Sequence, residues 1–286
     1  MKLVSYERNG RAGYGAIIDS MVAELSAEFS DVAPTLKLLL QAGALANAHT
    51  LVAEEKLPLF PLSEVTLAPV IPDPGQIFCI GLNYADHVSE TGRLITESPT
   101  VFLRVPASQT AHGHPIILPA ESGELDFEGE IAIVIGKGGR RISEDAAWSH
   151  IAGYSCYNDA SIRDWQAATT QWTAGKNFWR TGAFGPWMVT ADEIRPDQVM
   201  TLVTRLNGVE VQRSTTDLLI HSIPRQIAYL STFTPLAPGD VIVTGTPGGV
   251  GFKRQPKLFM KAGDTVEVEV DAIGVLRNSI EREASA

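Results

Sequence analysis

Short apolar runs separated by turn-forming residues make up most of the chain and predict β-strands. They stand at positions 3–6, 14–19, 77–81, 100–105, 115–119, 125–136, 202–206, 209–214, 240–245, 265–272 and 275–280. Asn207 and Gly208 separate two of these runs and are typical of a tight β-hairpin turn. Positions 131–135 are apolar throughout, as in a strand that is buried on both faces.

Fewer segments show a helical pattern. Positions 31–47 predict a helix with Asp31 as its cap and Pro34 in its first turn, and Gly43 can end it early. Shorter helices are expected at 84–90, 159–170 and 223–233. Because strands outnumber helices, the pattern predicts a β-rich α+β fold.

A proline-rich segment interrupts this pattern near residue 70. Five prolines stand at positions 58, 61, 69, 72 and 74, which excludes a helix and favours an extended linker. We therefore place a domain boundary here. Residues 1–73 are expected to form a small N-terminal α/β domain with its linker, and residues 74–286 a larger catalytic domain.

Composition narrows the class of protein. The chain has 286 residues, 44% of them hydrophobic and 20% charged, as in globular proteins. A net charge of −10 disfavours a nucleic-acid partner. The two cysteines, Cys79 and Cys156, exclude a disulfide framework and are expected to be buried free thiols. Without an apolar run of about 18–20 residues or a signal-peptide pattern, we expect a cytoplasmic protein without a membrane partner.

Three acids alternate in the segment 125–136. In a strand, Asp126, Glu128 and Glu130 would lie on one face, where they repel one another and lose hydration. A hard divalent cation is the simplest compensation for that repulsion. The alternative is a solvated polar face on an edge strand.

A second acidic element follows in the segment 153–166. If the helix begins near Asp159, then Arg163 and Gln166 share a face with it. An acceptor, a cation and an amide together suit a carboxylic-acid substrate, since the Arg fork binds both carboxylate oxygens. The alternative is an ordinary Asp–Arg pair on a wet helix.

Candidates for acid–base chemistry lie elsewhere. His87 and Glu90 have helical i,i+3 spacing, so a carboxylate can orient the imidazole as a general base, and Tyr84 lies three residues before His87. Lys176 could stabilise an oxyanion. A surface His–Glu pair and a solvated lysine are the alternatives. The glycine-rich stretch 245–251 matches no nucleotide-binding motif, and no serine-hydrolase elbow is present.

In their order along the chain, these motifs resemble the fumarylacetoacetate hydrolase family, in particular its acylpyruvase and fumarylpyruvate hydrolase members. The resemblance covers about residues 75–281. It rests on GLNYADHVSE, FLRVPAS, LDFEGEIAIVIGK, GYSCYNDASIRDWQ, GKNF, FGPWMVTADEI, VIVTGTPGGVG and KAGDTVEVEVDAIGVLRNSI.

The resemblance implies a mixed β-sandwich roll, a homodimer and Mg²⁺, with Mn²⁺ or Ca²⁺ as alternatives. The metal ligands would be Glu128, Glu130 and Asp159, with Asp126 supporting them from behind. The remaining implied site residues are the water-activating pair His87 and Glu90, and the substrate contacts Lys176, Arg163, Gln166, Thr246 and Tyr84. Arg104 replaces a common lysine, and Trp179 stands where small or acidic residues are common.

We therefore expect hydrolysis of a carbon–carbon bond in a β-diketone acid such as an acylpyruvate. The metal would polarise the oxo acid, the His87–Glu90 pair would activate water, and Lys176 would stabilise the oxyanion. The main alternative is oxaloacetate decarboxylation, or isomerisation or hydration of a 2-oxo acid from aromatic catabolism. A non-catalytic protein that binds metal or ligand is a third hypothesis.

Overall fold

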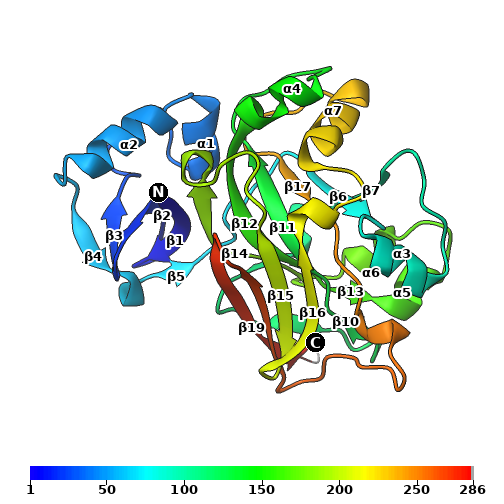
Figure 1. Ribbon diagram of the computed structural model, residues 1–286. Helices are drawn as coiled ribbons and strands as arrows, with labels where there is room; N and C mark the ends of the chain where they lie inside the picture. Colours follow the sequence, from blue (N-terminus) through cyan, green and yellow to red (C-terminus); the bar gives the residue numbers. More distant parts are fainter. Residues whose placement is uncertain (285–286) are drawn as a thin grey trace.

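The computed structural model describes residues 1–284 and is dominated by one large sheet (Figure 1). Its strands run in the order β4 (Leu59–Pro61), β3 (Met21–Glu24), β2 (Arg11–Ile18), β1 (Lys2–Arg8), β14 (Gly182–Thr190), β12 (Ile151–Asp159), β11 (Gly129–Ile135), β17 (Val241–Val243), β6 (Ile77–Gly81) and β7 (Thr100–Arg104), with β5 (Thr66–Leu67) beside β1 and β8 (Gln109–Ala111) beside β14.

A second sheet and a short ribbon complete the β-structure. The second sheet has the order β16 (Val209–Thr215), β15 (Thr201–Leu206), β18 (Thr265–Val270), β19 (Gly274–Arg282) and β9 (Ile116–Leu118). The ribbon pairs β10 (Leu125–Asp126) with β13 (Ser161–Ile162). The prediction of a β-rich α+β fold is confirmed.

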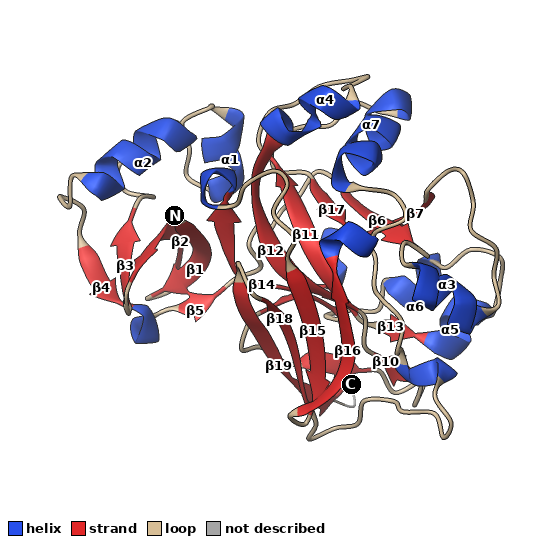
Figure 2. Cartoon of the chain, in the orientation of Figure 1, coloured by secondary structure: helices blue, strands red, loops and turns tan. Residues whose placement is uncertain are grey.

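The helices form three groups (Figure 2). α1 (Leu36–Gln41) and α2 (Leu45–Ala53) lie beside the N-terminal strands, and α4 (Glu144–Ala147) packs against α7 (Ile223–Phe233). α3 (Ala85–Thr91), α5 (Arg163–Ala167) and α6 (Thr173–Lys176) gather near the β10–β13 ribbon. This third group surrounds the candidate site.

β11 is the centre of the core, and its two faces serve two hydrophobic clusters. Ile131, Ile133 and Ile135 pack into the cluster that contains the second sheet and α7, whereas Ala132 and Val134 pack into the cluster that contains α1. All five side chains are at most 1% exposed. The uninterrupted apolar run is therefore explained by burial on both faces, as predicted.

The N-terminal strands extend the large sheet. β1 pairs antiparallel with β14, with Leu3 opposite Met188. The proline-rich segment is not a free linker, because β4 pairs with β3 and β5 pairs with β1. The proposed boundary after residue 73 stays a prediction, but the strands on its two sides share one sheet.

Two element boundaries differ from those predicted. The helix expected at 31–47 is two helices, and the Thr35 hydroxyl, not Asp31, caps the first at the backbone N–H of Leu38 (3.2 Å). Gly43, with φ +64°, separates the two helices, as expected. The strand expected at 125–136 is broken between β10 and β11, so Asp126 and Glu130 lie on different strands.

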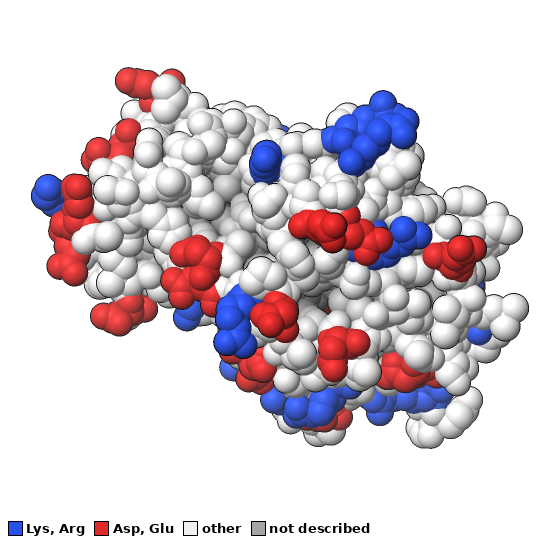
Figure 3. Space-filling model, turned by 45° about the horizontal axis from the view of Figure 1, so that its top comes forward, with Lys and Arg blue, Asp and Glu red and all other residues white. Residues whose placement is uncertain are grey.

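Several local predictions are confirmed. Asn207 and Gly208 both adopt positive φ, 52° and 77°, in the turn between β15 and β16. Cys79 and Cys156 are free and buried. Figure 3 shows acidic and basic side chains interspersed over the face in view. Within residues 1–284, the structure contains no helix that is both long and apolar enough to cross a bilayer.

Candidate active site

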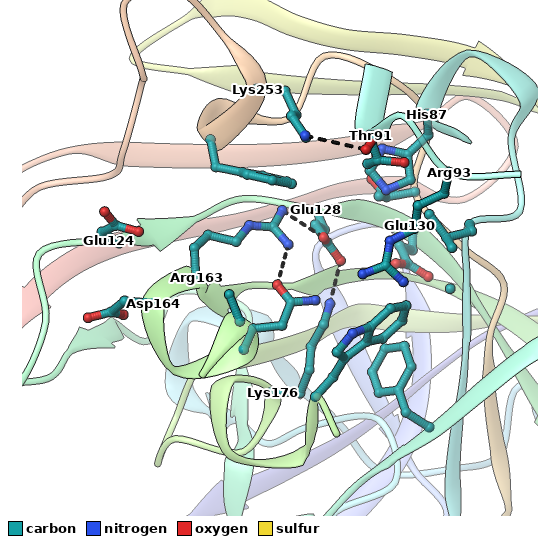
Figure 4. A pocket seen from close by; sticks show the side chains of 18 of the residues that line it. His87, Thr91, Arg93, Glu124, Glu128, Glu130, Arg163, Asp164, Lys176 and Lys253 are labelled. Atoms are coloured by element: carbon teal, nitrogen blue, oxygen red, sulfur yellow. Dashed lines mark hydrogen bonds and ion pairs between the residues drawn. The ribbon is translucent and has the colours of Figure 1, made fainter. Parts of the chain in front are cut away.

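A cavity of about 300 Å³ lies among α3, α5, α6 and the loop that follows β17 (Figure 4). Its lining includes residues that are distant in sequence, among them His87, Glu128, Glu130, Arg163, Gln166, Lys176 and Thr246. Ordinary ligand pockets start at about this volume, so the cavity suits a small molecule.

Three carboxylates converge at the inner end of this cavity. One oxygen from each of Glu128, Glu130 and Asp159 lies within 4.8 Å of the other two, and all three residues are buried. The convergence follows from the pairing of β11 with β12, because the Asp159 N–H donates to the Glu128 carbonyl (2.8 Å). The acidic residues therefore do not form a solvated face on an edge strand.

Lys176 lies beside this cluster and is only 2% exposed. Its Nζ atom donates to Glu128 Oε2 and to Asp159 Oδ2, each at 2.6 Å. Burial alone would raise the pKa of Glu128, but the charges of Lys176 and Arg163 outweigh it and lower that pKa to about 2. The alternative of a solvated lysine is wrong, and Glu128 is ionised at neutral pH.

Arg163 connects the cluster to Asp126. Its Nη2 atom lies 2.7 Å from Glu128 Oε1, and its Nε donates to Asp126 Oδ2 at 2.8 Å. Its Nη1 donates to Gln166 Oε1 at 2.7 Å, so these two residues share a face of α5, as predicted. Asp126 lies behind the acidic cluster and also accepts from the backbone of Gly251.

Asp159 does not share the helical face predicted for it. It is the last residue of β12, and α5 begins only at Arg163. Asp159 is paired with Lys176 and with Arg104, whereas Arg163 is paired with other acids, so the alternative of an Asp159–Arg163 pair on a wet helix is also wrong. The turn at 160–162 separates the two residues, because β13 returns to pair with β10.

The donor set and the charge of the cluster fit a hard divalent cation. Four buried carboxylates, Asp126, Glu128, Glu130 and Asp159, face three cations, Arg104, Arg163 and Lys176. Among residues 1–284, no cation lies within ion-pair distance of Glu130, which accepts one backbone N–H, that of Gly245 (2.5 Å). Burial and the charges of Asp159 and Glu128 raise its pKa well above the usual value. Carboxylate oxygens are the ligands that Mg²⁺ and Mn²⁺ prefer, and such an ion would compensate the excess negative charge.

The predicted pair of His87 and Glu90 is formed on α3. His87 Nδ1 lies 2.7 Å from Glu90 Oε1, and His87 lines the cavity. Glu90 Oε2 also accepts the backbone N–H of Gly249 at 2.9 Å, so the loop after β17 holds the carboxylate in place. The imidazole is therefore oriented by a fixed carboxylate and faces the acidic cluster's cavity.

The other predicted residues divide between the cavity and its surroundings. Thr246 lines the cavity and accepts a hydrogen bond from Gln212 Nε2 (2.8 Å). Tyr84 is 1% exposed, lies at the start of α3 and is not among the residues that line the cavity. Trp179 is 54% exposed, lies outside the lining and stacks with Arg180. The structure thus brings Thr246, but neither Tyr84 nor Trp179, to the cavity.

The comparisons with known proteins agree with this geometry. The family model described as fumarylacetoacetate (FAA) hydrolase C-terminal matches residues 76–281. The chain belongs to the fumarylacetoacetate hydrolase family. Among solved structures, the fumarylacetoacetate hydrolase of Exiguobacterium antarcticum has a TM-score of 0.88 at 30% identity and covers 99% of this chain and 100% of its own. The predicted family and its mixed β-sandwich roll are confirmed.

Two further relatives differ in the activity that their names state. The mitochondrial oxaloacetate tautomerase of Rattus norvegicus is 36% identical over 98% of this chain and 91% of its own length. The maleylpyruvate hydrolase of Sphingobium sp. SYK-6, solved with manganese and pyruvate, is 25% identical with a TM-score of 0.83, covering 99% of this chain and 100% of its own. This chain therefore belongs to a family of enzymes, and its relatives include tautomerases and hydrolases.

Some residues that line the cavity could not be identified from the sequence. Arg93, Trp172, Phe252 and Lys253 all reach the cavity from loops or from short turns. None of them belongs to a spaced motif, and only the fold brings them together.

Proposed function

We propose that this protein catalyses the keto–enol tautomerisation of oxaloacetate or of a similar 2-oxo dicarboxylic acid. The observation that carries the proposal is the 36% identity to the rat oxaloacetate tautomerase over almost the whole chain. Identity over a similar span is 30% to the Exiguobacterium fumarylacetoacetate hydrolase and 25% to the maleylpyruvate hydrolase. Isomerisation, the alternative to hydrolysis in the sequence analysis, is thereby favoured over C–C bond cleavage.

The cavity contains the groups that this reaction needs. Tautomerisation moves one proton between carbon 3 and the oxygen on carbon 2. Glu90 engages His87 Nδ1, which leaves Nε2 to take the proton from carbon 3 and to deliver it to the oxygen on carbon 2, with the reverse transfer in the other direction. Lys176 and Arg163 place positive charge beside the acidic cluster, where a substrate carboxylate and the developing enolate oxygen would lie.

The proposed metal ligands are Glu128, Glu130 and Asp159. A bound Mg²⁺, or alternatively Mn²⁺ or Ca²⁺, would supply Lewis-acid polarisation of the 2-oxo group. The fit of the site supports this proposal, as does the manganese bound in the maleylpyruvate hydrolase structure. Gln166 and Thr246 line the same cavity and are proposed to contact the substrate.

Hydrolysis of an acylpyruvate remains a second candidate because of the His87–Glu90 pair. An imidazole held by a carboxylate also suits activation of water, which would attack the distal carbonyl of a β-diketone acid. Both candidate reactions use His87 as the base. Tautomerisation takes a proton from carbon 3 of the substrate, whereas hydrolysis takes one from water. Decarboxylation of oxaloacetate, by contrast, requires neither proton abstraction from carbon 3 nor water activation.

The deciding experiment is a substrate panel on protein loaded with magnesium or manganese. Loss of the ultraviolet absorbance of enol-oxaloacetate measures tautomerisation, pyruvate formation measures decarboxylation, and loss of the diketone absorbance measures acylpyruvate hydrolysis. We expect tautomerisation to be fastest and to fall by about 10²–10⁴-fold in His87→Asn. The control His49→Asn changes a histidine in α2 that lies outside the cavity.

Each other outcome has a defined meaning. Acylpyruvate cleavage without accelerated tautomerisation would replace the proposal with the hydrolase. Tight metal binding without turnover of any oxo acid would support the non-catalytic hypothesis. Full tautomerase activity in His87→Asn would remove the histidine from the mechanism.

Assembly and location remain proposals. A homodimer is consistent with several large apolar side chains that are exposed in the single chain, among them Leu94, Ile95, Leu103, Trp165 and Trp179. Light scattering at micromolar concentration tests it. The cytoplasmic location also stays a prediction, since the rat relative is named as mitochondrial.

A further inference from the structure

Two cations of the cavity, Arg93 and Lys253, have no acidic partner in the described chain, and Lys253 donates to the Thr91 carbonyl (3.5 Å) instead. Arg93 directly follows Gly92, which ends α3 with φ +69°, and its side chain lines the cavity. Within residues 1–284, no carboxylate lies within ion-pair distance of its guanidinium, whereas Lys176 and Arg163 each pair with Glu128. In Figure 4, Arg93 reaches toward the same space as Glu128 and Lys176.

An aromatic platform holds this arginine. The Arg93 guanidinium carbon lies 5.2 Å from the centre of the Trp172 ring, and the Trp172 and Phe102 rings pack in a T-shaped arrangement with their centres 5.5 Å apart. A Cβ on Gly81 would lie 2.4 Å from the indole, so β6 admits Trp172 only because a glycine stands there. Stacking restricts the side chain but leaves the N–H groups at its edge free to bind an anion.

The same platform also contacts the lysine of the acidic cluster. Lys176 Nζ lies 4.8 Å from the centre of the Phe102 ring, on the side of the acidic cluster. The two packed rings thus contact the ion-paired Lys176 through Phe102 and the unpaired Arg93 through Trp172. This arrangement fits a short molecule with an anionic group at each end.

We infer that Arg93 binds the second carboxylate of the substrate and selects 2-oxo dicarboxylic acids over 2-oxo monocarboxylic acids. The planar guanidinium can bind both oxygens of that carboxylate. The inference rests on the proposed function for the orientation of the substrate, with its 2-oxo acid group at the acidic cluster. It adds a specificity residue that the sequence motifs do not contain.

Binding affinity tests this role separately from turnover. The probes are oxaloacetate and pyruvate, which share the 2-oxo acid group and differ by the distal carboxylate. Calorimetry on freshly mixed, manganese-loaded protein gives the ratio of their Kd values. We expect Arg93→Gln to weaken oxaloacetate about 10- to 100-fold, as for a lost hydrogen-bonded charge contact, and to leave pyruvate within about twofold.

Three further variants make the result specific. Arg93→Lys keeps the charge but loses the fork, so it should recover only part of the oxaloacetate affinity. Trp172→Leu removes the platform and should reduce the preference in the same direction. Arg11→Gln removes an exposed arginine of β2 and should leave both affinities unchanged.

The outcomes separate this inference from the proposed function. If wild-type protein prefers oxaloacetate and Arg93→Gln abolishes the preference, the inference holds even without tautomerase activity. If Arg93→Gln keeps the wild-type Kd ratio while tautomerisation is confirmed, the inference is overturned and the function stands. An equal loss of both affinities would also overturn it, because the arginine would then contact the shared 2-oxo acid group or support the fold.

Discussion

Replacing Arg104 with methionine should destabilise the metal-free protein strongly. The Arg104 side chain is fully buried and pairs with Asp159 at 2.5 Å. It also donates to Ser108 Oγ (3.2 Å), the Ala160 carbonyl (3.2 Å) and Thr181 Oγ1 (2.6 Å). Removing one partner of a buried ion pair costs about 3–5 kcal/mol, because the remaining charge stays in a dry site.

This cost converts into a measurable change in Tm. An unfolding entropy of about 2.1 cal/mol/K per residue gives about 0.6 kcal/mol/K for 286 residues. A loss of 3–5 kcal/mol therefore lowers Tm by about 5–8 °C. Scanning calorimetry in excess EDTA measures this change without a contribution from bound metal.

The matched control is Arg195→Met. Arg195 pairs with Asp197 at 3.7 Å, and the two side chains are 80% and 88% exposed. Such a pair contributes at most about 1 kcal/mol, so the control should change Tm by less than 2 °C. Arg104→Lys keeps the charge and should lose less stability than Arg104→Met.

A double-mutant cycle tests the stated cause. In Arg104→Met combined with Asp159→Asn, the buried carboxylate that lost Arg104 and kept only Lys176 as its cation is gone, so the loss should be smaller than the sum of the two single losses by at least about 1 kcal/mol. Strict additivity would refute the reasoning. A Tm of Arg104→Met within 2 °C of wild type would refute it more directly.

Two further predictions concern the metal and the first helix. Glu130→Gln removes the carboxylate that lacks a cationic partner, so its Tm in EDTA should equal or exceed that of wild type, and the Tm increase on adding manganese should be lost. The control Glu124→Gln changes a cavity residue outside the cluster and should keep the increase. An undiminished increase in Glu130→Gln would contradict the ligand assignment. Thr35→Ala removes the helix cap and should cost about 1 kcal/mol in a denaturant titration, whereas Asp31→Ala should cost less than about 0.5 kcal/mol. The reverse order of these two losses would contradict the observed cap.

Features that depend on a few neighbouring residues were predictable from the sequence. Asn207 and Gly208 form the expected turn because their tolerance of positive φ is intrinsic. His87 and Glu90 meet because i,i+3 spacing within one helix places them together. The double burial of 131–135 follows equally from its composition.

Features that depend on strand pairing were not accessible in the same way. The break between β10 and β11 arises because β10 pairs with β13 while β11 pairs with β12, so Asp126 is directed to Arg163 and not to the acidic cluster. The helix that was expected to begin at Asp159 begins at Arg163 for the same reason. The ion pair of Lys176 with Glu128 was not predicted, because the family resemblance implied only that Lys176 contacts the substrate.

The junction between β1 and β14 has a consequence for expressing parts of this protein. A fragment that starts at residue 74 would retain every candidate ligand and the complete His87–Glu90 pair. It would also leave the backbone groups of Met188 and Val189 without the strand that now pairs with them. Such an open edge recruits other chains, so the fragment would be prone to aggregate through intermolecular strand addition. The first seventy residues thus cover an edge of the sheet and protect it from intermolecular pairing, although they contribute none of the candidate ligands.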